Sequence, residues 1–154
     1  MEINIIIFLN LLLYSIIVSQ SFSYIISLED VQRKMDAATY ITFRKQTDKN
    51  FLKKFSKVVY GTIATNTLLV VMTSNYTTGL LFITAALAWV ALVVEILLTL
   101  KGNMPINRLV NTWTTENYPD NWEMHREKWL QVFRKRQVLN ITGFLLLLIG
   151  AIFQ

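Results

Sequence analysis

The residues able to carry acid–base or recognition chemistry gather in one part of the chain. The single histidine, His125, and three of the four tryptophans lie between Pro105 and Lys135. This part directly follows an apolar stretch that contains one carboxylate, Glu95. Any catalytic or binding chemistry is therefore expected at this polar and aromatic edge of an otherwise apolar protein.

Glu95 is the strongest single candidate. A carboxylate within an apolar span is energetically unfavourable, and it usually faces a bundle interior or an aqueous cavity with a partner. At the rise of an α-helix, Glu95 lies about 9 Å from Lys101, and Arg136 and Asn140 are expected at a comparable depth. We predict a Glu95–Arg136 pair, which either serves catalysis or is a structural ion pair between two helices.

His125 is a candidate general base, because the unperturbed pKa of a histidine lies near 6.5. The alternative is a histidine that simply faces water. One histidine and no cysteine leave only Glu95, Glu123 and Glu127 to complete a metal site. We therefore predict no protein-ligated metal and no haem, and hence no cofactor.

A stripe of aromatic and polar residues continues through the C-terminal third. Alternating steps of three and four residues place its members on one face of a helix. These members are Trp122, Arg126, Trp129, Phe133, Arg136, Asn140 and Gly143. Such a face suits a flat aromatic ligand that carries a negative charge. The alternative is that the tryptophans lie at a membrane interface, where Trp is enriched.

Four apolar stretches must position these residues. Hydrophobic residues make up 53% of the 154 residues, and a membrane-spanning helix needs roughly 20 apolar residues. We predict one all-α domain over residues 1–154, an integral membrane four-helix bundle with cytoplasmic helical extensions. The spans are expected at about 3–28, 57–73, 79–100 and 137–153, joined by connections 29–56 and 101–136. The first stretch is interpreted as a span rather than a signal peptide, because Glu2 replaces the usual basic residues.

The charge pattern predicts the orientation. All fifteen Lys and Arg lie within residues 33–57 and 101–136. The positive-inside rule therefore predicts cytoplasmic connections and non-cytoplasmic termini in the plasma (inner) membrane. Anionic lipid head groups, rather than nucleic acid, are the expected counterions of the net charge of +5. The absence of cysteine excludes disulfides and zinc–thiolate sites.

Two local signals predict helix boundaries in the last connection. Pro105 lacks a backbone donor and restricts its predecessor, so residues 103–107 are expected to break the helix. A helix-like segment is expected over residues 108–115. Asp120 or Asn121 is the expected N-cap of a helix that runs unbroken from Trp122 to Phe153.

The C-terminal third resembles an uncharacterised membrane family that includes the fungal anthrone oxygenases. The resemblance rests on Pro105-Ile106-Asn107 after the third span and on the aromatic and basic residues before the last span, namely Trp122, Arg126, Trp129 and Arg136. It covers about half of the chain by motif and all of it by the four-span plan. Family members of known role oxidise an anthrone to an anthraquinone with dioxygen, without a flavin or a protein-bound metal.

The resemblance implies a hydrophobic, aromatic small-molecule substrate and a membrane-embedded oxygenase. In such chemistry a base removes a ring proton, and the protein positions and stabilises the resulting anion. The candidate bases are Glu95 and His125, and the candidate anion-binding residues are Asn107, Arg126 and Arg136. The expected stacking residues are Trp122 and Trp129, with Asn140 beside them in the substrate site.

Other functions stay open at this point. The first alternative is a non-enzymatic lipid- or quinone-binding protein, or an accessory subunit of a membrane complex. A transporter is disfavoured by the small size and by the absence of paired broken helices. The expected partners are the hydrophobic substrate and membrane lipid, without nucleic acid, and a homo-oligomer is compatible with this plan.

Overall fold

The computed structural model describes residues 2–154, and helices are the only regular elements among them. In chain order they are α1 (Glu2–Ser23), the π-helical turn η1 (Tyr24–Leu28), α2 (Glu29–Lys34), α3 (Ala37–Thr73), the 3-10 turn η2 (Ser74–Tyr76), α4 (Leu80–Leu98), the π-helical turn η3 (Thr99–Asn103), α5 (Met104–Thr112) and α6 (Trp122–Phe153).

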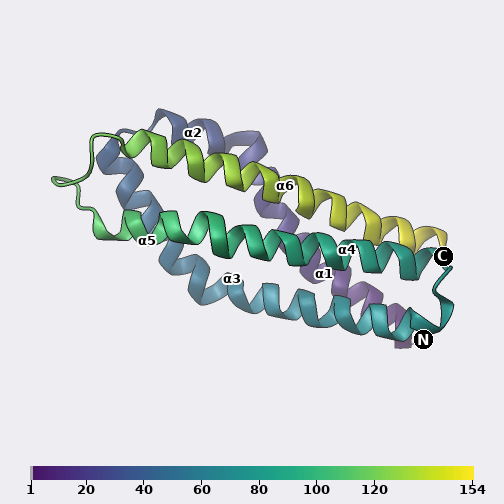
Figure 1. Cartoon of the computed structure of the whole chain (residues 1–154). Coiled ribbons are helices and arrows are strands. Elements are labelled where there is room, and N and C mark those ends of the chain that lie inside the picture. Colours follow the sequence, from purple (N-terminus) through teal and green to yellow (C-terminus); the bar gives the residue numbers. More distant parts are fainter. Residues whose placement is uncertain (1) are drawn as a thin grey trace.

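These elements form four rods. The π-helical turns join α1 to α2 and α4 to α5 without a break, while α3 and α6 are each one long helix (Figure 1). Each rod is long and apolar enough to cross a membrane. The all-α prediction with four apolar helices is therefore confirmed.

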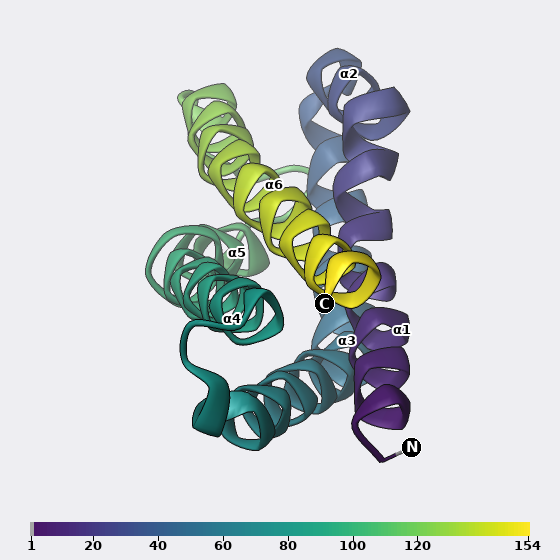
Figure 2. The same cartoon turned by 90° about the vertical axis from the view of Figure 1, so that its right-hand side faces the viewer.

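The rods are arranged as a ring. Helix α1 packs against α3 and α6, and α4 packs against the same two helices on the other side (Figure 2). Both chain ends and the η2 turn lie at one end of the bundle, and the loop between α5 and α6 lies at the other (Figure 1). We call the latter the basic end, because every Lys and Arg belongs to residues 33–57 or 101–136.

The core has a different composition at each end. Toward the chain termini, small residues such as Ala85 and Ala88 of α4 are fully buried and allow close helix packing. Gly150 also allows α6 to approach α4 closely, because a Cβ at this position would lie 2.1 Å from Thr84 Oγ1. Toward the basic end the core is aromatic, with Tyr40 and Phe133 among its members. Two members of this cluster, Tyr24 and Trp129, line the candidate site.

The predicted helix break at residues 103–107 is wrong. The chain stays helical from α4 through η3 into α5, and Pro105 occupies the second position of α5. The wider π-helical turn at Thr99–Asn103 comes just before the proline, which has no N–H to donate to the preceding turn of helix. Asn103 and Asn107 therefore lie on one continuous helical rod, which ends at Thr112 rather than at the expected Thr115.

The last helix agrees with the sequence prediction. Helix α6 runs without interruption from Trp122 to Phe153, so its basic-end residues and its apolar residues share one rigid axis. Asn121 holds the N-cap position, although its side chain makes no capping hydrogen bond. Helix α3 is also longer than its apolar part, since it begins at Ala37 and extends through the predicted connection.

Candidate functional site

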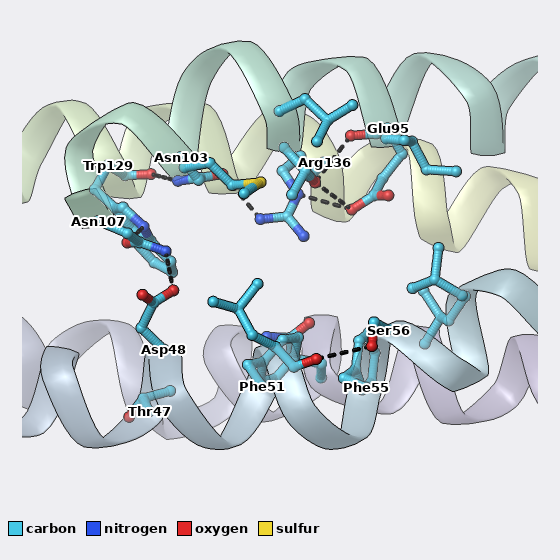
Figure 3. Close-up of a pocket in the computed structure, with 18 of the residues that line it drawn as sticks. Thr47, Asp48, Phe51, Phe55, Ser56, Glu95, Asn103, Asn107, Trp129 and Arg136 are labelled. Atoms are coloured by element: carbon cyan, nitrogen blue, oxygen red, sulfur yellow. Dashed lines mark hydrogen bonds and ion pairs between the residues drawn. The ribbon is translucent and has the colours of Figure 1, made fainter.

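A cavity of about 260 Å³ lies between α3 and the α4–α5 rod, toward the basic end (Figure 3). Helices α1 and α6 contribute further parts of its wall. Its polar lining residues are Gln20, Arg44, Thr47, Asp48, Ser56, Glu95, Thr99, Asn103, Asn107 and Arg136. Its volume falls near the lower limit of small-molecule sites, which span roughly 300–1,000 Å³. The cavity therefore suits one small ligand.

The Glu95–Arg136 contact forms one part of the polar wall. Arg136 Nε on α6 donates to Glu95 Oε1 on α4 over 2.7 Å, and both residues are buried. The hydroxyl of Thr99 also donates to Glu95 Oε1, over 3.3 Å. Glu95 Oε2 accepts no hydrogen bond from any of residues 2–154. One carboxylate oxygen is thus held in place and the other stays available.

Asn103 fixes the second side of the Arg136 guanidinium. Its Oδ1 accepts from Arg136 Nη1 over 2.9 Å, and its Nδ2 donates to the backbone carbonyl of Trp129 over 2.9 Å. Both contacts are buried, so they orient Arg136 without contact to solvent. Figure 3 shows the guanidinium turned toward the open space between the two walls of the cavity.

Asn107 is the centre of the other polar part. Its Oδ1 accepts from Arg44 Nη2 over 2.8 Å and from Trp129 Nε1 over 2.9 Å. Its Nδ2 donates to Asp48 Oδ1 over 2.8 Å, and Asn111 donates to Asp48 Oδ2 over 2.9 Å. One amide therefore connects α3, α5 and α6 and holds the Trp129 ring in position.

Aromatic rings complete the site. The Arg44 guanidinium lies 3.9 Å from the centre of the Trp129 ring, which stacks on Phe133 at 5.0 Å and 12° between planes. Across the cavity from Trp129, the ring centres of Phe51 and Phe55 on α3 lie 4.2 Å apart. The lining is therefore polar near the two arginines and apolar along Phe51 and Phe55, which suits an amphipathic molecule with a ring.

The structure divides the predicted site residues into two groups. Glu95, Asn107, Trp129 and Arg136 line the cavity. The remaining four, which do not line it, are His125, Trp122, Arg126 and Asn140.

Each of these four has its own surroundings. His125 meets Trp113 edge-on at 5.5 Å between ring centres. Arg126 donates to the carbonyls of Gln32 and Met35 and lies over the Trp122 ring, so it ties α6 to the junction of α2 and α3. Asn140 is buried one turn beyond Arg136. The geometry therefore favours Glu95 over His125 as a base for a ligand in the cavity.

Sequence reasoning missed Arg44 and Asp48. They lie one turn apart on α3, within a stretch that reads as a mixture of charged and apolar residues. The only available signal was the helical spacing of Tyr40, Arg44 and Asp48, which places all three on one face. Nothing in that spacing distinguishes a buried arginine from a solvated one.

No group of three or more metal-ligating side chains comes together among residues 2–154. The chain matches no protein family model, no curated protein and no solved structure. The resemblance to the anthrone oxygenases therefore stays a prediction. The feature of the structure that suggests a function is the cavity with its two arginines and two carboxylates.

Proposed function

We propose that this protein is an integral membrane enzyme that oxygenates a flat, hydrophobic small molecule in the cavity between α3 and α4–α5. The observation that carries the proposal is the buried Glu95–Arg136 pair, which lies in the cavity wall together with the Trp129 ring and with Phe51 and Phe55 of α3. The wall combines a carboxylate with a free oxygen, a fixed cation and a stacking surface.

The membrane part of the proposal rests on the four apolar helices and on the basic end. Insertion with the basic end in the cytoplasm follows the positive-inside rule and leaves both termini outside, in the plasma (inner) membrane. The cavity then opens near the level of the lipid head groups. A hydrophobic substrate is concentrated in the bilayer and reaches the cavity from there.

The proposed reaction converts a ring methylene and dioxygen into a ring carbonyl and water. Glu95 takes one proton from the methylene, and the electron pair left on the ring reduces dioxygen to a bound peroxide. Glu95 returns its proton to the peroxide. Loss of the second methylene proton with cleavage of the O–O bond then forms the carbonyl, and the departing oxygen leaves with both protons as water. Arg136 stabilises the negative charge that develops on the ring oxygen, while Trp129 and Phe51 keep the ring in place.

The test uses purified protein in a neutral detergent with anthrone as the substrate and an oxygen electrode as the detector. The proposal expects one dioxygen consumed per anthraquinone formed, above the rate without protein. Glu95→Gln and Arg136→Lys should each lower turnover by about a hundredfold or more, within the range of a lost general base or charge stabiliser. Arg108→Gln is the matched control, because Arg108 is exposed on the same rod as Asn107.

Two results would contradict this assignment. The first is a folded wild-type protein that leaves the anthrone oxidation rate at its protein-free value. The second is full turnover in Glu95→Gln together with lost turnover in His125→Gln, which would move the base to α6 outside the cavity.

A second candidate function is binding without conversion, with a quinone or a lipid as the ligand. It is favoured by the oxygens of Asp48, both of which already accept hydrogen bonds from asparagine side chains. This carboxylate of the cavity wall therefore holds other side chains in position. This function predicts a quinone or lipid that copurifies with the protein in gentle extracts and is detected by native mass spectrometry, with no oxygen consumed.

A further inference from the structure

Arg44 is a buried cation that lacks a carboxylate partner. Only 4% of its surface is exposed, and it takes part in none of the ion pairs found among residues 2–154. A desolvated charge without a counterion is strongly unfavourable, and buried charges are therefore normally paired. Arg136, on the same cavity wall, follows this rule through its contact with Glu95.

The contacts that Arg44 does make are neutral. Its Nη2 donates to the amide oxygen of Asn107 over 2.8 Å, and its guanidinium lies 3.9 Å from the centre of the Trp129 ring. Its Nε has no hydrogen-bond partner within residues 2–154. The guanidinium is thus held against Trp129 with an unsatisfied donor.

The acceptors nearby are already occupied. Asp48 accepts from Asn107 and Asn111, and Asn107 Oδ1 receives two donors. Arg44 therefore has no ion-pair partner of its own, and the Asp48 carboxylate is linked to it only through Asn107. A ligand that pairs with Arg44 directly brings an acceptor oxygen with negative charge.

We infer that the cavity binds its ligand as an anion, with a carboxylate or phenolate oxygen paired to Arg44 and a flat apolar ring beside Phe51 and Phe55. A guanidinium gives strong, charge-assisted hydrogen bonds to such oxygens. The cavity volume of about 260 Å³ holds a small ring acid rather than a phospholipid with two acyl chains. The inference uses the cavity of the proposed function and adds the charge state of its ligand.

The test compares anthracene-9-carboxylate with its methyl ester, which has the same ring without the charge. Both are titrated by calorimetry into the full-length protein in a neutral detergent, and protein-free micelles provide the reference. We expect the acid to bind at least about tenfold more tightly than the ester, as charge-assisted pairing to a buried guanidinium predicts. Neither probe has a methylene to oxidise, so a failure of oxygenation leaves this experiment unaffected.

Variants then locate the pairing group. Arg44→Gln should weaken binding of the acid by about tenfold or more and leave ester binding within about twofold. Arg44→Lys keeps the charge and should retain a preference for the acid, while the exposed Arg108→Gln should bind both probes like the wild type.

Three results would overturn the inference. The first is equal affinity of the wild-type protein for acid and ester, a comparison that needs no variant to fold. The second is an unchanged acid preference in Arg44→Gln. The third is displacement of the carboxylate probe by short-chain phosphatidylglycerol but not by phosphatidylcholine, which would assign the anion to a lipid head group instead of a ring acid.

Discussion

Arg136 on α6 donates from Nε to Glu95 Oε1 on α4 over 2.7 Å, and both side chains are at least nine-tenths buried. The pair connects the two helices that pack most extensively against each other. It also borders the cavity, so its role in folding and its role in ligand binding can be separated only by measuring both stability and activity.

Removal of one member of this pair should destabilise the bundle more than removal of both. Arg136→Met leaves the Glu95 carboxylate buried without a cation, which typically destabilises a protein by roughly 3–5 kcal/mol. The double variant Glu95→Leu with Arg136→Met removes both charges and should recover most of that loss. Equilibrium unfolding in detergent measures the three stabilities. An Arg136→Met protein that unfolds within about 1 kcal/mol of the wild type would show that the pair contributes little.

The orientation of the protein in the membrane can be mapped with introduced cysteines, because the chain has no cysteine of its own. Asn75→Cys lies in the η2 turn at the end that holds both termini, and Thr115→Cys lies in the loop at the basic end. A membrane-impermeant maleimide added to intact cells should label Asn75→Cys at once and Thr115→Cys only after the membrane is opened. The reverse pattern would place the basic end outside.

Gly150 should not tolerate a methyl group while Thr84 keeps its hydroxyl. A Cβ at Gly150 would lie 2.1 Å from Thr84 Oγ1, so Gly150→Ala forces α4 and α6 apart and should destabilise by roughly 1–3 kcal/mol. Thr84→Ala removes the clashing oxygen and should restore most of the stability in the double variant.

Gly61→Ala is the matched control for this experiment. A Cβ at Gly61 meets only the flexible end of Leu13, at 3.2 Å, and alanine favours the helix by up to about 1 kcal/mol. Thermal unfolding in detergent measures all four variants. A Gly150→Ala protein as stable as Gly61→Ala would contradict the close approach of α4 and α6.

The start of α3 should depend on pH through Asp36. The backbone N–H of Thr39 donates to Asp36 Oδ1 over 2.8 Å, and this bond together with the Thr39 hydroxyl lowers the pKa of the carboxyl below its usual 3.8. A lowered pKa means that the stabilisation is complete above about pH 3.8 and is lost as pH falls through the lower value of the folded state. The protection of the Thr39 and Tyr40 amides against hydrogen exchange, measured relative to the unfolded chain at the same pH, should therefore fall in acid.

Two variants separate the charge of Asp36 from its capping bond. Asp36→Asn keeps a side-chain acceptor without a titratable group, so the protection of these amides should no longer fall in acid. Asp36→Ala removes the cap and should give low protection at every pH. Protection that still falls in acid in Asp36→Asn would show that another group controls the end of the helix.

Much of the fold follows from composition and hydropathy. Four apolar stretches of suitable length can satisfy their backbone groups in an apolar environment only as helices, and α6 begins and ends where its pattern predicts. Glu95 within one such stretch required a buried partner, and Arg136 at a matching depth was the predicted choice. The contact between the two is confirmed, and helical rise accounts for their matching depths.

The membership of the cavity wall is decided by tertiary packing. Periodicity places Arg44 on a face of α3, but burial depends on α5 and α6, whose Asn107 and Trp129 cover it. The same packing leaves His125 against Trp113 instead of in the cavity. Pro105 interrupts a regular helix in any local prediction, yet the π-helical turn before it keeps the rod continuous and brings Asn103 and Asn107 to the cavity wall. Local propensity specifies which segments are helices, whereas contacts between segments distant in the chain specify which of their polar side chains meet.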